Sequence, residues 1–147
     1  MELRIVSDKK RYKRSDKIRI DVMLTNKDYV REIFVYGKLG WGYRASLTDI
    51  IRDARGKRIS PKMFSDDLNI PISRGDTSLF VRLLPNHFLG THFVEEIDQL
   101  NLTKPGRYSI EVEYHCPISI ADVDQINFFS KEDGKIESNV IWIEVIP

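Results

Sequence analysis

Apolar and polar residues alternate along much of this chain, which predicts strands rather than helices. The clearest alternation follows the Pro105-Gly106 turn and ends at Cys116. Its apolar side is Tyr108, Ile110, Val112, Tyr114 and Cys116, and its polar side is Arg107, Ser109, Glu111, Glu113 and His115. A strand with one apolar and one polar side is typical of an antiparallel sheet that buries one face. We therefore expect residues 107–116 to form the central strand of such a sheet.

Further strands are expected along the chain. Residues 3–6 and Lys17–Thr25 alternate in the same way, and Arg31–Leu39 is apolar on both sides, as expected of a strand covered on both faces. A last strand is predicted over Ser138–Ile146. If its core side is Ile141, Ile143 and Val145, its outer side is Val140 and Trp142.

Turn signals separate shorter segments. Leu47–Arg52 and Lys57–Ile59 flank Asp53-Ala-Arg-Gly56, which predicts a hairpin with Gly56 in a left-handed conformation. Thr77–Leu84 predicts one more strand, and Phe93–Leu102 is a further candidate. The expected connectors are 7–16, 60–76, 85–92 and a long insert, 118–135. Seven to nine short strands of this kind predict an all-β, antiparallel two-sheet sandwich.

Composition limits the function classes. A chain of 147 residues is expected to be a single domain, 1–147. Its net charge of +1 argues against bulk electrostatic binding of nucleic acid, and no apolar run reaches the length of a membrane-spanning helix. We expect neither nucleic-acid binding nor membrane insertion. No signal peptide is recognised, so a cytoplasmic protein and an extracytoplasmic one with its signal removed both remain open.

Two segments resemble known β-sandwich families. Leu102-Thr-Lys-Pro-Gly-Arg-Tyr108 resembles the corner before the penultimate strand of immunoglobulin-like and fibronectin-III-like domains, where a Tyr hydroxyl bonds to upstream backbone. Ser7–Val22 resembles the opening of macroglobulin-type and bacterial immunoglobulin-like modules, with Arg14-Ser15 in place of the usual Pro-Gly. The resemblance implies an immunoglobulin-like sandwich and implies no particular activity.

No catalytic constellation is recognised, so we expect no enzyme. Neighbouring strand residues face opposite sides, which separates His115 from Cys116, and Cys116 is interpreted as a buried apolar residue. His87 and His92 with Cys116 include ligand types of copper sandwiches, but residues 117–135 supply no further His or Met. Acidic loop residues and the basic run Lys9–Arg14 are interpreted as solvated surface. We therefore expect no metal and no cofactor.

Aromatic residues offer the candidate binding sites. In an immunoglobulin-like sheet, Phe34 and Tyr36 would share the outer face of the last strand with Trp142, forming a partner surface. The alternative is that the 118–135 insert folds back, with Phe128-Phe129, and covers them. Trp41 and Tyr43, between glycines, suggest a ligand loop that stacks on a sugar or peptide, with simple packing as the alternative.

The sequence therefore predicts a non-catalytic binding module whose partner is another protein or a second copy of the chain. A carbohydrate-binding module that uses its exposed aromatic residues is the alternative.

Overall fold

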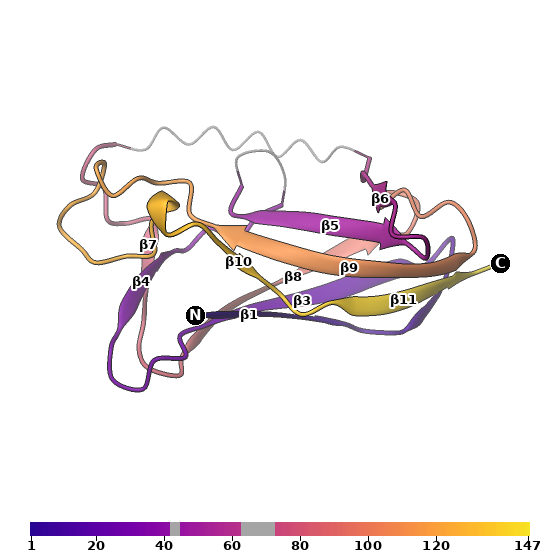
Figure 1. Cartoon of the computed structure of the whole chain (residues 1–147), viewed down its shortest axis with the longest axis horizontal. Coiled ribbons are helices and arrows are strands. Elements are labelled where there is room, and N and C mark those ends of the chain that lie inside the picture. Colours follow the sequence, from indigo (N-terminus) through magenta and orange to yellow (C-terminus); the bar gives the residue numbers. More distant parts are fainter. Residues whose placement is uncertain (42–44, 63–72) are drawn as a thin grey trace.

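The computed structural model describes residues 1–41, 45–62 and 73–147, and the described chain is all-β. It contains eleven strands and one short 3-10 turn, Lys131–Asp133, where the sequence predicted seven to nine strands. The strands form an elongated sandwich, with the carboxyl terminus at one end and a small extra sheet at the other (Figure 1). The predicted fold class, a β-sandwich, is confirmed.

One layer of the sandwich is a three-stranded antiparallel sheet. Its order is β1 (Glu2–Ser7), β3 (Lys17–Thr25) and β8 (Phe88–Glu96). The bounds of β3 are those predicted, because its apolar residues alternate without interruption and face the core. Strand β8 starts inside the predicted 85–92 connector, and it pairs with β3 along all nine of its residues. No residue of β8 is fully buried, so its sequence indicates a strand only weakly. Its pairing with β3 therefore decides where the strand begins.

The facing layer has six strands, and the predicted central strand is its centre. Strand β9 (Gly106–His115) pairs with neighbours on both sides, and the Tyr108 hydroxyl donates to the carbonyl of Lys104 at 2.6 Å, as the predicted corner requires. The predicted hairpin at Gly56 is also confirmed, with φ of 78°. The remaining strands of this layer are β2 (Arg11–Lys13), β5 (Leu47–Asp53), β6 (Arg58–Ile59), β10 (Lys135–Glu137) and β11 (Ile141–Ile146).

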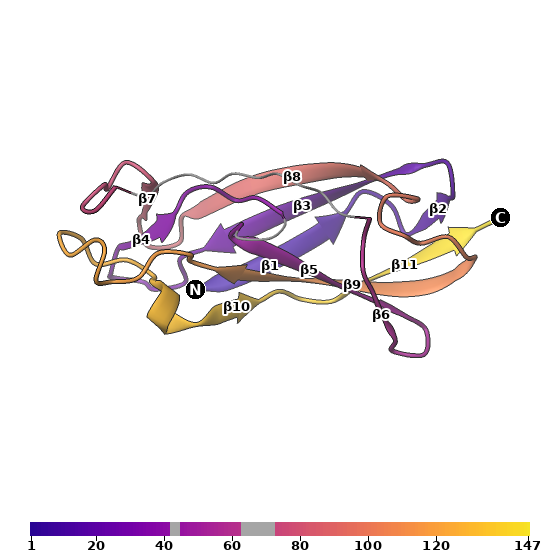
Figure 2. The ribbon, with the colours of Figure 1, turned by 90° about the horizontal axis from the view of Figure 1, so that it is seen from above.

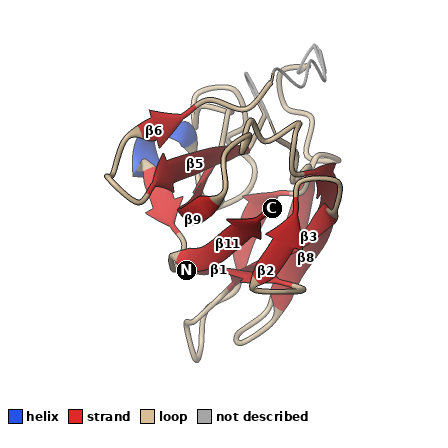
Figure 3. Ribbon diagram, turned by 90° about the vertical axis from the view of Figure 1, so that its right-hand side faces the viewer, coloured by secondary structure: helices blue, strands red, loops and turns tan. Residues whose placement is uncertain are grey.

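Strand β2 lies within the predicted polar connector. It pairs in parallel with β11 and forms one edge of the six-stranded sheet. The chain therefore starts in one layer, as β1, and crosses to the other layer between Ser7 and Arg11. Viewed along the long axis, β2 and β11 lie side by side (Figure 3). Strand β1 pairs instead with β3 in the other layer.

Strands β4 (Ile33–Tyr36) and β7 (Phe80–Leu83) form a separate two-stranded sheet. It lies at one end of the molecule, beside the insert that follows β9 (Figures 1 and 2). The prediction that Arg31–Leu39 shares a sheet with the last strand is therefore wrong. Strand β5 takes the place beside β9 instead, because its seven residues match the β9 register from Tyr114 to Tyr108.

The core has two parts. The larger one fills the space between the two main sheets and includes Ile143 and Val145, so the predicted core side of the last strand is confirmed. A smaller cluster lies under the insert and contains Tyr36, Phe80, Cys116, Ile118, Val123 and Phe128. Tyr114 joins the two parts: it belongs to the larger core, and its hydroxyl accepts a hydrogen bond from the Tyr36 amide at 3.1 Å.

Candidate functional site

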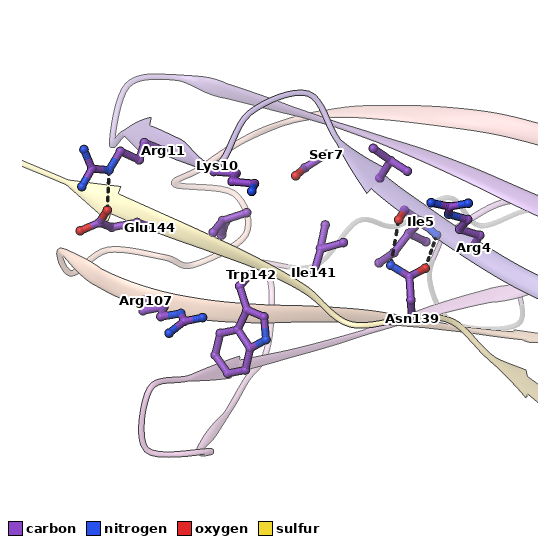
Figure 4. A pocket seen from close by; sticks show the side chains of 12 residues that line it. Arg4, Ile5, Ser7, Lys10, Arg11, Arg107, Asn139, Ile141, Trp142 and Glu144 are labelled. Carbon is purple, nitrogen blue, oxygen red and sulfur yellow. Dashed lines mark hydrogen bonds and ion pairs between the residues drawn. The ribbon is translucent and has the colours of Figure 1, made fainter.

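A groove of about 970 Å³ lies between β1 and β11, where the chain crosses from one sheet to the other (Figure 4). Strand β1 ends at Ser7, and β2 pairs with β11 only from Glu144 onward. N-terminal to Glu144, no strand of the described residues pairs with the edge of β11 that faces away from β9. The groove therefore exposes the edge of β11 around Trp142.

Polar contacts close the groove at both ends. At one end the Asn139 side chain accepts from the Ile5 amide at 2.8 Å and donates to the Ile5 carbonyl at 3.1 Å, in the manner of a neighbouring strand. At the other end Arg11 donates to the Glu144 carboxylate at 2.7 Å, and the Glu144 amide donates to the Lys10 carbonyl at 2.8 Å. The two walls are therefore held at a fixed separation (Figure 4).

Trp142 is the large aromatic residue of the groove. It is 46% exposed, and Val140 beside it is 47% exposed, so the predicted outer side of the last strand is confirmed. The Arg107 guanidinium lies 4.5 Å from the centroid of the Trp142 ring and covers one of its faces. Directly opposite Trp142 on β9, Ser109 is buried. Because the Arg107 guanidinium covers one face of the ring, a partner that contacts Trp142 has less side-chain motion left to immobilise.

The groove is strongly basic for a nearly neutral protein. Arg4, Lys10, Arg11 and Arg107 line it, with one carboxylate, Glu144, which gives it a charge of +3. The whole chain carries +1, so the remaining residues sum to −2. Within the described residues, neither Arg4 nor Lys10 makes an ion pair. A concave surface lined mainly by one sign of charge concentrates its field on a bound partner.

Phe34 and Tyr36 lie far from this groove in the fold, on β4. The insert folds back over them, as the alternative interpretation expected: the Phe34 amide donates to Asn127 at 3.3 Å, and the Phe129 amide donates to the Phe34 carbonyl at 2.9 Å. Tyr36 is only 6% exposed. A common outer face of Phe34, Tyr36 and Trp142 is therefore not formed.

Trp41 is packed into the core. It is 9% exposed, and its ring centroid lies 4.2 Å from that of Phe93 on β8. The alternative, simple packing of Trp41, is thus confirmed. The buried ring offers no face on which a ligand could stack from solvent. Tyr43, the other residue of the predicted ligand loop, lies outside the described residues.

Cys116 is fully buried, as its strand position predicted. Burial raises the pKa of its thiol to about 11, so the reactive thiolate is scarce at neutral pH. Its sulfur contacts the Ile118 carbonyl at 3.7 Å, whereas His87 and His92 are exposed. The Cys–His arrangements considered from the sequence are therefore not assembled.

Asp49 is an unusual residue of the sandwich interior. It lies on β5 between Leu47 and Ile51, which both belong to the core. Its Oδ2 atom is buried and accepts no hydrogen bond from any described residue. Burial raises the pKa of this carboxyl group, and nearby Arg58 lowers it only in part.

Asp49→Asn is expected to raise the free energy of unfolding at pH 7 by about 1–2 kcal/mol, because it removes a buried charge that Arg58 compensates only in part. A raised pKa in the folded state means that the wild type is most stable below the unfolded pKa and loses stability as pH rises through the folded pKa. The gain should therefore be larger at pH 7 than at pH 4 in urea titrations. Asp124→Asn, in an exposed loop, is the control. An equal gain in the free energy of unfolding at both pH values would contradict a raised pKa of Asp49.

Comparison with known proteins assigns no family: no protein-family model matches the chain, and no curated protein matches it significantly. Among the described residues, no three His, Cys, Asp or Glu side chains gather as metal ligands would. No helix within those residues is long and apolar enough to cross a lipid bilayer. The groove at Trp142 is therefore the candidate site that the geometry itself supplies.

Sequence reasoning identified Trp142 and missed the residues around it. The alternation placed Arg107 only on the polar side of its strand, and the run that contains Lys10 and Arg11 was interpreted as solvated surface. The signal that was present is the density of that basic run. The sequence does not show that β2 pairs with β11, and this pairing brings Lys10 and Arg11 into the groove that Trp142 also lines.

Proposed function

We propose that this chain is a single, non-catalytic, immunoglobulin-like β-sandwich module that binds another protein through the groove at Trp142. The order β1-β3-β8 facing β11-β9-β5 supports the immunoglobulin-like assignment, because such sandwiches also place their last two strands beside a third in one sheet. The tyrosine corner at Tyr108 supports it as well.

One observation carries the proposal: a tryptophan that is 46% exposed, restrained by Arg107, lies in the large groove of the fold. Tryptophan and arginine are the residue types most enriched among those that dominate protein–protein binding energy. Carbohydrate binding receives no comparable support, since the ring of Trp41 is buried.

Trp142→Ala should abolish most partner binding without unfolding the protein. We expect the specific partner to be retained on immobilised wild type from an extract of cells that make this protein, and its affinity to fall about 30-fold with Trp142→Ala, which corresponds to about 2 kcal/mol. Phe88→Ala is the matched control, because Phe88 is a 62% exposed aromatic residue on the opposite sheet.

Light scattering over a concentration series identifies the case in which the partner is a second copy of the chain. Partners retained equally by wild type and Trp142→Ala would contradict the proposal, provided that circular dichroism shows the variant to be folded.

A further inference from the structure

We propose that the groove binds an acidic, extended segment of the partner, which adds a short strand to the open edge of β11 at Trp142. This inference rests on the proposed function and specifies the chemistry of the partner.

The first argument is the direction of the β11 backbone. The Glu144 amide donates to the Lys10 carbonyl, so Glu144 directs its backbone groups away from β9 and toward β2. Residues two apart in a strand direct their backbone groups to the same side. Trp142 therefore presents its amide and carbonyl to the groove, where β2 has not yet begun. An open strand edge of this kind pairs readily with an extended peptide.

The second argument is the length of the open edge. Asn139 closes one end of the groove, and Glu144 closes the other. At about 3.3 Å per residue, these five steps along the chain span roughly 16 Å. Three or four residues of a partner fit along β11, and the rest of its chain must leave toward solvent. A short linear segment suits this groove better than a long strand does.

The third argument is charge. Arg4 and Lys10 line the groove and make no ion pair with any described residue. The Arg107 guanidinium lies over a face of the Trp142 ring. A segment that carries Glu or Asp would pair with these cations, whereas a basic segment would be repelled. A nucleic-acid strand fits less well, because the Arg107 guanidinium already occupies one face of the Trp142 ring on which a base would stack.

The apolar residues that line the groove favour a partner segment that carries apolar side chains between its acidic ones. Ile141 and Trp142 are consecutive on β11 and lie on opposite sides of it (Figure 4). An added strand would likewise place successive side chains on the two sides. A segment that alternates acidic and apolar residues can then pair with the cations and cover Ile141 or Trp142.

The test is an NMR titration of the ¹⁵N-labelled chain with the acetylated hexapeptide amide Glu-Val-Glu-Val-Glu-Val. We expect shifts of the Ser7, Lys10 and Trp142 amides and of one indole N–H, which Trp142→Phe identifies since the chain has two tryptophans. The dissociation constant should rise steeply between 50 and 500 mM salt, because the cations are accessible to solvent. The Lys-Val counterpart of the peptide should produce no shifts in the groove.

Two further peptides test strand addition itself: one N-methylated at every Val amide, the other at every Glu amide. Only one of these sets can face β11, so we expect at least one methylated peptide to bind ten-fold or more weakly. Both binding as well as the parent peptide would overturn strand addition. Inorganic polyphosphate that shifts the same resonances as strongly as the acidic peptide would overturn the assignment to a peptide.

The variants separate this inference from the proposed function. Arg4→Ala combined with Lys10→Ala should weaken the acidic hexapeptide at least ten-fold, and Lys57→Ala, an exposed cation of the β5–β6 turn, should not. Absence of any groove shift with the hexapeptide, alongside Trp142-dependent partner capture, would overturn this inference alone. Groove shifts alongside partner capture that ignores Trp142 would overturn the proposed function.

Discussion

Tyr12→Ala is expected to lower the free energy of unfolding by about 3–5 kcal/mol, the usual cost of deleting a large aromatic side chain from a core. Tyr12 stands within the basic run, yet it is 0% exposed and belongs to the larger core. Its removal leaves a cavity beneath β2. Urea denaturation followed by circular dichroism measures the change, and a loss below 1 kcal/mol would contradict an anchoring role for this ring.

Tyr12→Phe separates the hydroxyl from the ring. The hydroxyl donates to the Asp8 carboxylate at 2.7 Å and accepts from the Lys9 amide at 2.9 Å, so its loss is expected to cost about 1.5–3 kcal/mol. Burial raises the pKa of Asp8, but hydrogen bonds from Tyr12 and the Arg19 amide outweigh it and leave that pKa lowered. A lowered pKa stabilises the fold above the unfolded pKa, and this stabilisation is lost as pH falls through the folded pKa. The deficit of Tyr12→Phe should therefore shrink in acid.

The same residue connects stability with the candidate site. Tyr12 fixes β2 against the core, and β2 with the preceding residue carries Arg11 and Lys10 to the groove. We therefore expect Tyr12→Ala to weaken the groove shifts caused by the acidic hexapeptide even under conditions where the variant is folded. The groove depends on a buried residue that contributes no surface to it.

Local alternation predicted the parts of the fold whose pattern is uninterrupted. Strand β3 keeps its predicted bounds because four apolar residues at alternate positions all face the core. Strand β9 was correctly predicted as central because its apolar and polar residues alternate along its length. The hairpin at Gly56 follows from a turn that requires a left-handed residue. Each of these features is decided by neighbours in the chain.

Features decided by distant partners could not be predicted. Strand β2 has a single buried residue, Tyr12, between exposed basic ones, which is too short to display a period. Strand β4 pairs with β7, more than forty residues later, and nothing in its own composition specifies that partner. Trp41 lies between glycines and still packs against Phe93, because burial of its ring outweighs the flexibility that the glycines suggest.

The candidate site shows the same division. The exposed position of Trp142 follows from alternation within its own strand. Its companions, Arg4, Lys10 and Arg107, come from three separate segments that only sheet register brings together. The expected companions, Phe34 and Tyr36, were assigned by analogy to a sheet order in which β4 lies beside the last strand, and β5 occupies the corresponding place.

Phe128→Ala is expected to release the insert from β4 and to make Cys116 reactive. Phe128 is 4% exposed, its ring lies 4.6 Å from that of Phe80, and both belong to the small cluster that contains Cys116. Loss of about 3 kcal/mol corresponds to a roughly 100-fold larger open population, if opening is faster than labelling. Labelling of the single cysteine with a thiol reagent measures this directly. Phe88→Ala, an exposed aromatic residue elsewhere, should label at the wild-type rate.

Comparison with Tyr12→Ala shows whether that opening is local. Both substitutions remove a buried aromatic ring, but Tyr12 belongs to the core between the sheets and Phe128 to the cluster beneath the insert. If the insert opens by itself, Phe128→Ala exposes Cys116 far more often than Tyr12→Ala does at equal global stability, because a local opening leaves the two main sheets intact. Equal labelling rates at equal global stability would mean that Cys116 is reached only when the whole sandwich unfolds, and that the Tyr114 contact with Tyr36 couples the two clusters into one cooperative unit.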